Sequence, residues 1–296
     1  MKRHASTALR MKTLAATAAF AAFFTGGARA EELVKRAPET MSETGMRFTP
    51  GRLRIAGACE TDCAQFIAAD GEIGFGSAIA FLLARKMAGE RDLPVLLNSP
   101  GGYVVGATNL GRMWRRFNVT VIIARATPVA CGEPGPCEEK GVKLFDVSLE
   151  KAECASACPF ALAGAMVRIA PPGVSIGVHE THVDETSAVG KTLRAALTEA
   201  ERKQAHAESQ ADIEAFLKEM GVDAELGRRA MKTSYEKVDW LSADDVARYR
   251  LSTAGVEAIT SPPGLSVALA RSAVGAVSTS RKSKSGSGAF TKPQRP

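Results

Sequence analysis

Residues 153–160 of the 296-residue chain read Glu-Cys-Ala-Ser-Ala-Cys-Pro-Phe. Ser156 lies at their centre, where a polar segment gives way to a run of small apolar residues. A serine at such a boundary can present its hydroxyl at the start of a helix, where unpaired backbone N–H groups stabilise developing negative charge. We therefore take Ser156 as a candidate nucleophile. The common alternative is that it only caps the helix that follows.

Two other segments supply the remaining parts of an acyl-transfer site. Residues 98–102 read Asn-Ser-Pro-Gly-Gly, and their glycines offer backbone donors. Residues 177–180 read Gly-Val-His-Glu, in which His179 offers a base. A nucleophile, a base and backbone donors are the groups that acyl transfer requires. His182 competes with His179 for the role of base, and the glycines could serve the turn alone.

The two ends of the chain differ from its middle. Four basic residues, an apolar run at 14–24 and Ala28-Arg29-Ala30 make residues 1–30 typical of a secretory signal peptide. The apolar run is short for a membrane span, so we expect membrane association only if this segment is not cleaved. Residues 31–47 are polar and aperiodic, which indicates a linker. The basic tail at 261–296 is rich in Ser, Gly, Lys and Pro and is predicted to be disordered. Residues 48–260 suit one α/β domain.

The formal net charge of +6 comes from those ends. Residues 1–30 hold five basic and no acidic residues, and the tail from residue 262 holds six basic and no acidic ones. Residues 31–261 hold 27 basic and 32 acidic residues. The domain itself is therefore mildly acidic, and its charge gives no reason to expect a nucleic-acid partner.

The cysteines form three close pairs, namely Cys59 with Cys63, Cys131 with Cys137, and Cys154 with Cys158. Behind a signal peptide, an even number of cysteines predicts disulfides made in an oxidising compartment. Glycines and prolines between Cys131 and Cys137 make that pair the easiest to close. A helical spacing would put the other neighbouring pair near the upper limit of disulfide geometry, so pairing with the preceding cysteine loop is equally open. The spacings do not fit a structural zinc site, and we expect neither a metal nor a cofactor.

Apolar patterns predict the order of elements. We expect strands at residues 52–56, 94–97, 119–124, 166–169, 174–178 and near 256, and helices at 77–87, 104–117, 156–163 and 243–249. Residues 94–124 have the pattern of a βαβ unit, and residues 131–150 look like an insert. A long helical region at 192–220 contains an almost wholly polar stretch, which indicates a helix that projects into solvent or packs against another copy.

Four motifs in this order resemble the Clp protease proteolytic subunit of the ClpP/crotonase superfamily, and more closely its secreted bacterial relatives. The resemblance covers residues 52–258. It is carried by residues 98–102, by Ala155-Ser156-Ala157, by Val178-His179 and by Trp240-Leu241-Ser242-Ala243. It implies a ClpP/crotonase-like superhelix of ββα units with a long C-terminal helical region, and a homo-oligomer.

The resemblance also implies roles for individual residues. Ser156 would be the nucleophile and His179 the general base, the amides of Gly102 and Ala157 would form the oxyanion hole, and Gly101 would lie against the substrate.

The acid of the triad is less plainly marked. The family's position for it holds Val238 in this chain. We predict Asp239 as its substitute, which requires a shift of the local loop, because a slip of one residue turns a side chain to the opposite face. Glu236 and Asp184 are the other nearby acids, and Lys191 offers a different solution as a lysine base.

These patterns predict an exported serine hydrolase, periplasmic or secreted, that acts as an ATP-independent peptidase on exposed or unfolded polypeptide. Because an exported chain has no supply of ATP, no ATPase partner is expected. The alternative is an inactive ClpP-like binding or assembly scaffold that keeps the fold and has lost the acid.

Overall fold

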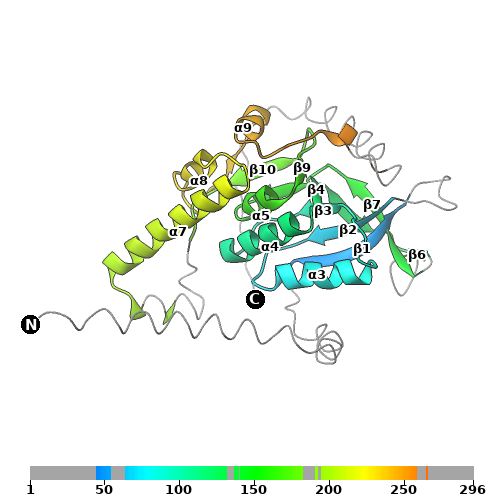
Figure 1. Ribbon diagram of the computed structural model, residues 1–296, viewed down its shortest axis with the longest axis horizontal. Coiled ribbons are helices and arrows are strands. Elements are labelled where there is room, and N and C mark those ends of the chain that lie inside the picture. Colours follow the sequence, from blue (N-terminus) through cyan, green and yellow to red (C-terminus); the bar gives the residue numbers. More distant parts are fainter. Residues whose placement is uncertain are drawn as a thin grey trace, which may run out of the picture. The chain divides into compact units, whose positions relative to one another are not determined.

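One mixed β-sheet forms the centre of the fold in the computed structural model (Figure 1). The structure describes residues 45–54, 64–131, 137–139, 141–182, 191–192, 195–258 and 265, all within one unit that spans Thr44–Pro296. The expected signal peptide, most of the linker, almost all of the tail, Cys59, Cys63 and Asp184 lie outside the described residues.

The sheet has eight strands, and the strands in one half of it are parallel. Its order is β5 (Arg125–Pro128), β7 (Val142–Ser148), β1 (Arg47–Leu53), β2 (Gln65–Asp70), β3 (Val95–Asn98), β4 (Thr120–Ile123) and β9 (Val167–Ile169), with β6 (Glu138–Glu139) paired to β7. Four neighbouring strands, β2, β3, β4 and β9, are parallel to one another, whereas β1 runs antiparallel to β2. The predicted βαβ unit is confirmed, because β3 and β4 pair in parallel on either side of α4 (Val104–Arg116).

Both faces of this sheet are buried. Along β3, Val95 and Leu97 point into one apolar core and Leu96 into another. Alternate residues of β4 divide in the same way between the two cores. Continuous apolar strands such as these are expected where a parallel sheet is covered on both sides.

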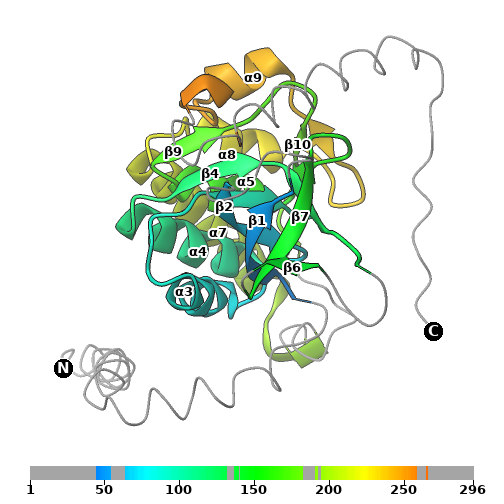
Figure 2. The same cartoon turned by 90° about the vertical axis from the view of Figure 1, so that its right-hand side faces the viewer.

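Helices α3 (Ser77–Met87), α4 and α5 (Cys158–Gly164) contribute to the first core (Figure 2). Phe81, Trp114 and Phe160 are almost fully buried there. Helices α4 and α5 meet at two glycines, and a Cβ atom on Gly164 would lie 2.1 Å from the carbonyl oxygen of Gly111. Glycine is therefore needed at this crossing, and it brings α5 close enough to fix the segment that contains Ser156.

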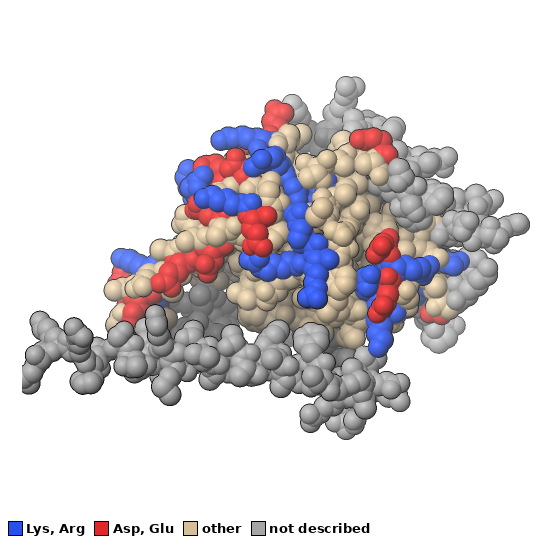
Figure 3. All heavy atoms as spheres, in the orientation of Figure 1, with Lys and Arg blue, Asp and Glu red and all other residues tan. Residues whose placement is uncertain are grey.

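The long helical region is α7 (Glu199–Glu219), which begins with a capping box made by Thr198 and Glu201. Figure 1 shows α7 running outward from the sheet. Residues 199–208 are exposed, while Ile213, Phe216 and Leu217 are buried against the body of the molecule. Figure 3 shows acidic side chains along α7 and a band of basic ones beside it. No described helix is long and apolar enough to cross a membrane.

A smaller sheet of three strands joins the C-terminal part to the centre. Its order is β11 (Asp239–Trp240), β10 (Ser175–Val178) and β8 (Glu153–Ala155). Helix α8 (Glu225–Ala230) precedes β11, and α9 (Ala243–Arg248) follows it. Strands β8 and β10 are parallel, so both end at the same edge of this sheet.

Several expectations need correction. The first strand ends at Leu53, before the expected range does, and Met46 in the expected linker is part of the core. The insert at 131–150 supplies β6 and β7 to the main sheet. The segment near Val256 forms a 3-10 helix, η2 (Val256–Ala258), where a strand was expected. Leu265, inside the expected tail, is fully buried.

Candidate active site

The three segments of the predicted site follow three strands that run in the same direction. Residues 98–102 follow β3, Ser156 follows β8, and His179 follows β10. Strands β8 and β10 pair in parallel, and Ser99 forms a parallel bridge with Cys154 of β8. The carboxyl ends of parallel strands meet at one edge, where α/β proteins place their sites.

Ser156 has an unusual backbone. Its φ of +59° lies in the left-handed region, which costs a residue with a side chain about 1–2 kcal/mol. The Ser156 amide donates to the carbonyl of Gly177, at 2.9 Å. This bond joins the end of β8 to β10, two residues before His179.

The Ser156 side chain does not cap a helix. The N-cap of α5 is Ala157, and no side chain caps this helix. The Ser156 hydroxyl makes no hydrogen bond with any described residue, and Ser156 is partly exposed between the buried Ala155 and Ala157. Ser156 thus combines a free hydroxyl with a disfavoured backbone conformation, a combination that is frequent at functional sites.

The turn at residues 98–102 packs directly on Ser156. A Cβ atom on Gly101 would lie 2.4 Å from the Ser156 Cβ, and Gly101 itself has a φ of +116°. Both the close approach and the backbone conformation require glycine at this position. The predicted contact between the glycine turn and the serine is therefore present.

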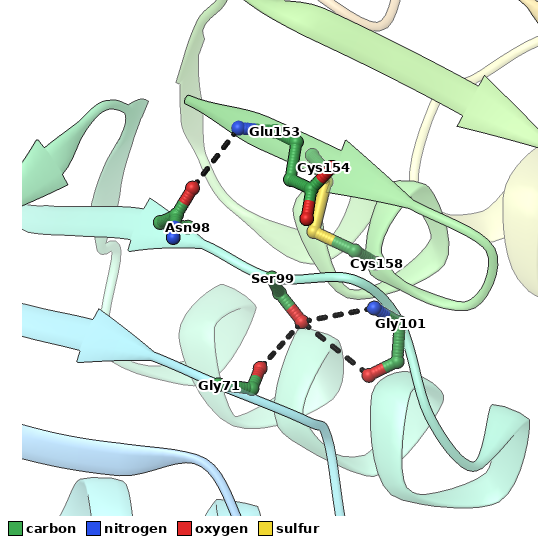
Figure 4. The surroundings of a disulfide bond; sticks show 7 residues. All are labelled: Gly71, Asn98, Ser99, Gly101, Glu153, Cys154 and Cys158. Carbon is green, nitrogen blue, oxygen red and sulfur yellow. Dashed lines mark hydrogen bonds between the residues drawn. A yellow bond between two sulfur atoms is a disulfide. The ribbon is translucent and has the colours of Figure 1, made fainter. Parts of the chain in front are cut away.

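Polar side chains hold this turn in place (Figure 4). Ser99 Oγ donates to the carbonyl of Gly71 at 2.7 Å and accepts a hydrogen bond from the Gly101 amide at 3.2 Å. Asn98 bridges two strand ends, because its Nδ2 donates to Asp70 and its Oδ1 accepts from the Glu153 amide. These contacts fix the position of the turn against β8.

The two amides predicted to form an oxyanion hole are unpaired within the described part of the chain. Gly102 pairs with Ile73 as a bridge, but the bridge uses the carbonyl of Gly101 and the amide of Tyr103. The amides of Gly102 and Ala157 donate to no described residue. Ala157 is almost fully buried, so an unpaired N–H group there has an uncompensated cost unless a ligand accepts from it.

His179 is partly buried at the end of β10, and its ring orientation is defined by one hydrogen bond. Its Nδ1 lies 2.8 Å from the carbonyl oxygen of Glu180. Because a carbonyl can only accept, Nδ1 must carry the proton, and Nε2 is left with a free lone pair. This tautomer is the one that a general base needs.

The rest of the His179 environment comes from the segment between α8 and β11. The Glu180 amide donates to the carbonyl of Thr233, and the Glu180 carboxylate accepts from the Tyr235 amide. The Tyr235 ring lies 5.3 Å from the His179 ring and stacks on His182 at 4.3 Å. No sequence pattern indicates the role of the Glu180 carbonyl, since every residue has a carbonyl, and Tyr235 belongs to no recognisable motif.

The structure does not bring the predicted acid to His179. In the antiparallel pair of β10 and β11, Val178 lies opposite Asp239, and the Val238 side chain packs over Gly177. The Asp239 carboxylate accepts two hydrogen bonds from the Arg229 guanidinium, at 2.6 and 3.0 Å. These bonds, with those to Tyr249 and Asp245, raise the pKa of Arg229. Among the described residues, no carboxylate forms a hydrogen bond or ion pair with the His179 ring, and Lys191 is exposed.

Two of the three cysteine pairs lie within the described residues, and both form disulfides. Cys131 bonds to Cys137, as predicted. Cys154 bonds to Cys158, so the alternative pairing with the preceding cysteine loop is wrong. The expected Cα separation of Cys154 and Cys158 assumed a helix over residues 154–158. Instead, Cys154 lies in β8 and the chain turns at Ser156, which brings the two Cα atoms to 5.1 Å. Disulfides of this kind are consistent with a secreted or extracellular protein.

Comparison with known proteins adds no family. No protein-family model matches the chain, and a search of curated proteins finds no match. Within the described ranges, no three His, Cys, Asp or Glu side chains gather in a way that could hold a metal ion.

Proposed function

We propose that the chain is an exported serine hydrolase of the ClpP/crotonase type, acting as an ATP-independent peptidase. Ser156 Oγ attacks the carbonyl carbon of a peptide bond, and His179 Nε2 accepts its proton. The amides of Gly102 and Ala157 stabilise the resulting oxyanion. His179 then gives the proton to the leaving amine, and water hydrolyses the acyl-enzyme by the reverse sequence.

One observation carries this proposal. The Ser156 hydroxyl has no hydrogen-bond partner among the described residues, its backbone is left-handed, Gly101 packs against its Cβ, and the amide of the next residue, Ala157, is unpaired. A structural serine would be expected to use its hydroxyl in a cap or turn. A nucleophile needs it exposed and surrounded by donors.

The Glu180 carbonyl takes over one part of the work of a triad acid. It supports the Nδ1–H tautomer, and so leaves Nε2 able to accept the serine proton. It does not carry the negative charge that would stabilise the imidazolium. We therefore propose a Ser-His pair oriented by the backbone, with weaker charge stabilisation than a complete triad provides.

The substrate we propose is exposed or unfolded polypeptide in the periplasm or outside the cell. A compartment without ATP leaves no role for a feeding ATPase, so the substrate enters unaided. Self-association is part of the proposal. The exposed half of α7 offers a polar surface for another copy, in the manner that the resemblance implies.

A specific observation favours a second candidate, an inactive binding or assembly scaffold. By the resemblance, Val238 stands at the position where the family has its acid, and the Asp239 carboxylate is bound by Arg229. The scaffold keeps the fold and the serine turn, but predicts no chemistry at Ser156.

Labelling with a fluorophosphonate probe separates the two candidates. This probe phosphonylates an activated serine. The mature wild-type protein should be labelled, peptide mapping should place the label on Ser156, and Ser156→Ala should abolish labelling. Ser175→Ala is the matched control, because Ser175 is an exposed serine on the neighbouring strand β10, and this variant should label like the wild type. A folded, oxidised wild-type protein that takes up no label would favour the scaffold.

A further inference from the structure

The Cys154–Cys158 disulfide encloses the proposed nucleophile. It joins the residue two positions before Ser156 to the residue two positions after it, so Ser156 is the central residue of a five-residue covalent ring. Both cysteines are fully buried. Figure 4 shows the disulfide beside the Ser99 to Gly101 turn that packs on the serine.

The other constraints on this turn come from packing and from the backbone, and not from polar side chains. Gly101 packs on the Ser156 Cβ atom, the flanking residues Ala155 and Ala157 have no polar side-chain atoms, and the N-terminus of α5 has no side-chain cap. The backbone bonds run from the Ala155 amide to Ser99, from the Ser156 amide to Gly177, and from the Phe160 and Ala161 amides to the carbonyl of Ala157. A left-handed backbone at a residue other than glycine persists only where the surroundings enforce it.

We infer that the Cys154–Cys158 disulfide is a positioning group, which holds Ser156 in its left-handed conformation and thereby aims the hydroxyl and the Ala157 amide at one point. The catalytic part of this inference rests on the proposed function. The disulfide is fixed rather than exchangeable in the folded protein, because its sulfurs are buried and thiol exchange needs access to them.

The second disulfide supplies a matched control. Cys131 and Cys137 are separated by 6 residues and Cys154 and Cys158 by 4. Since the entropic effect of a cross-link depends only on the logarithm of loop length, removing either bond should change global stability by a similar amount. Only the second removal takes a constraint from Ser156.

The experiment compares Cys154→Ala/Cys158→Ala with Cys131→Ala/Cys137→Ala in the oxidised, otherwise intact chain. Thermal melting first shows that each variant is folded at the assay temperature. Should the alanine pair not fold, the nearly isosteric Cys154→Ser/Cys158→Ser takes its place. Hydrogen exchange of the Ser156 amide and the kinetics of fluorophosphonate labelling are then measured for both variants.

We expect the Ser156 amide to exchange at least about tenfold faster when the enclosing disulfide is removed, while exchange in α4 rises only as much as it does in the control variant. The maximal labelling rate should fall about 10- to 100-fold, while the probe concentration that gives half-maximal rate is unchanged, because the nucleophile is misplaced and the binding surface is not. The control should show neither effect.

Unchanged exchange at Ser156 would overturn the inference, whatever the labelling shows. Faster exchange with unchanged labelling would overturn the catalytic part, since the held turn would not matter for reactivity. A wild-type protein that is never labelled would instead overturn the proposed function. The exchange comparison would in that case still decide whether the disulfide holds the turn.

Discussion

Ser156 caps no helix, and its hydroxyl has no hydrogen-bond partner among the described residues. In a serine that caps α5, the hydroxyl would accept a hydrogen bond from a backbone N–H group, but Ala157 occupies the cap position. Its left-handed φ has no local explanation, because neither a glycine nor a helix end requires it there. Strain held by surrounding structure at an exposed polar group is typical of active sites.

Substitution of Asp239 tests whether Ser156 and His179 act without a triad acid. The Asp239 carboxylate is bound by Arg229, and both side chains are partly buried. We expect Asp239→Asn to lower stability by about 1 kcal/mol and to leave fluorophosphonate labelling of Ser156 close to the wild-type rate. Loss of a true triad acid would instead reduce the rate by about 10⁴-fold. Melting curves and labelling rates measure the two effects separately.

The matched control for that variant is Asp245→Asn. Asp245 also pairs with Arg229, but it lies on α9. It should give a similar loss of stability and normal labelling. If Asp239→Asn is folded and its labelling falls at least about 100-fold while the Asp245 variant reacts normally, Asp239 is the acid after all.

The sequence allowed candidate site residues to be chosen by their chemistry, but it did not indicate how their side chains are oriented. Ser156, Gly101 and His179 belong to short motifs whose chemistry can be read directly. The choice between Val238 and Asp239 depends on strand register, which a slip of one residue reverses. The register is set only when β11 pairs with β10, and that pairing places Asp239 opposite Val178.

Helices and strands were predictable where a regular pattern has a clear end. The helix at 77–87 has the bounds expected for it, but its buried side is formed by Ala80, Phe81 and Ala84, while Ile79 is exposed. Size alone did not indicate which apolar residues face the sheet. Strand β7 was taken for part of an insert, because its pairing with β1 joins residues about ninety positions apart.

The N-terminus of helix α9 should lose stability at low pH. Asp245 forms a capping box with Ser242 and an ion pair with Arg229. Hydrogen bonds from Ser242, and then from Arg229, lower the pKa of Asp245 from 3.8 to about 2. Because the folded-state pKa is below the unfolded one, this stabilisation is present above about pH 4 and is lost as the pH falls towards 2.

Melting temperatures measured from pH 5 to pH 2 check this. The wild-type protein should lose stability relative to Asp245→Asn across that window, so the difference between them narrows. Asp244→Asn, on the same turn of α9, is the control and should follow the wild type. A difference in melting temperature between the wild type and Asp245→Asn that stays constant over this pH range would contradict the lowered pKa of Asp245.

Ser242→Ala removes the other partner of the capping box. It should lower stability by about 1 kcal/mol at neutral pH, or the melting temperature by about 2–4 °C.

The two disulfides act in separate parts of the molecule. Cys131–Cys137 closes the loop that leads from β5 to β6 and β7, at one edge of the main sheet. Cys154–Cys158 closes the turn between β8 and α5. A disulfide typically contributes about 2–4 kcal/mol to the free energy of unfolding of a secreted protein. Reduction should therefore weaken the sheet edge and the serine turn independently.

Export and oxidation should accordingly be required for a fully stable protein. We expect chain directed to an oxidising compartment to show no free thiol at Cys131, Cys137, Cys154 or Cys158 when it is denatured, alkylated and mapped by mass spectrometry. The same chain made in a reducing cytosol should be alkylated at these positions and should melt at a lower temperature. Reoxidation after purification should restore the melting temperature, which separates loss of disulfides from misfolding. Alkylation of Cys154 in the exported, natively folded protein would contradict the disulfide framework and remove the basis for a covalently held nucleophile.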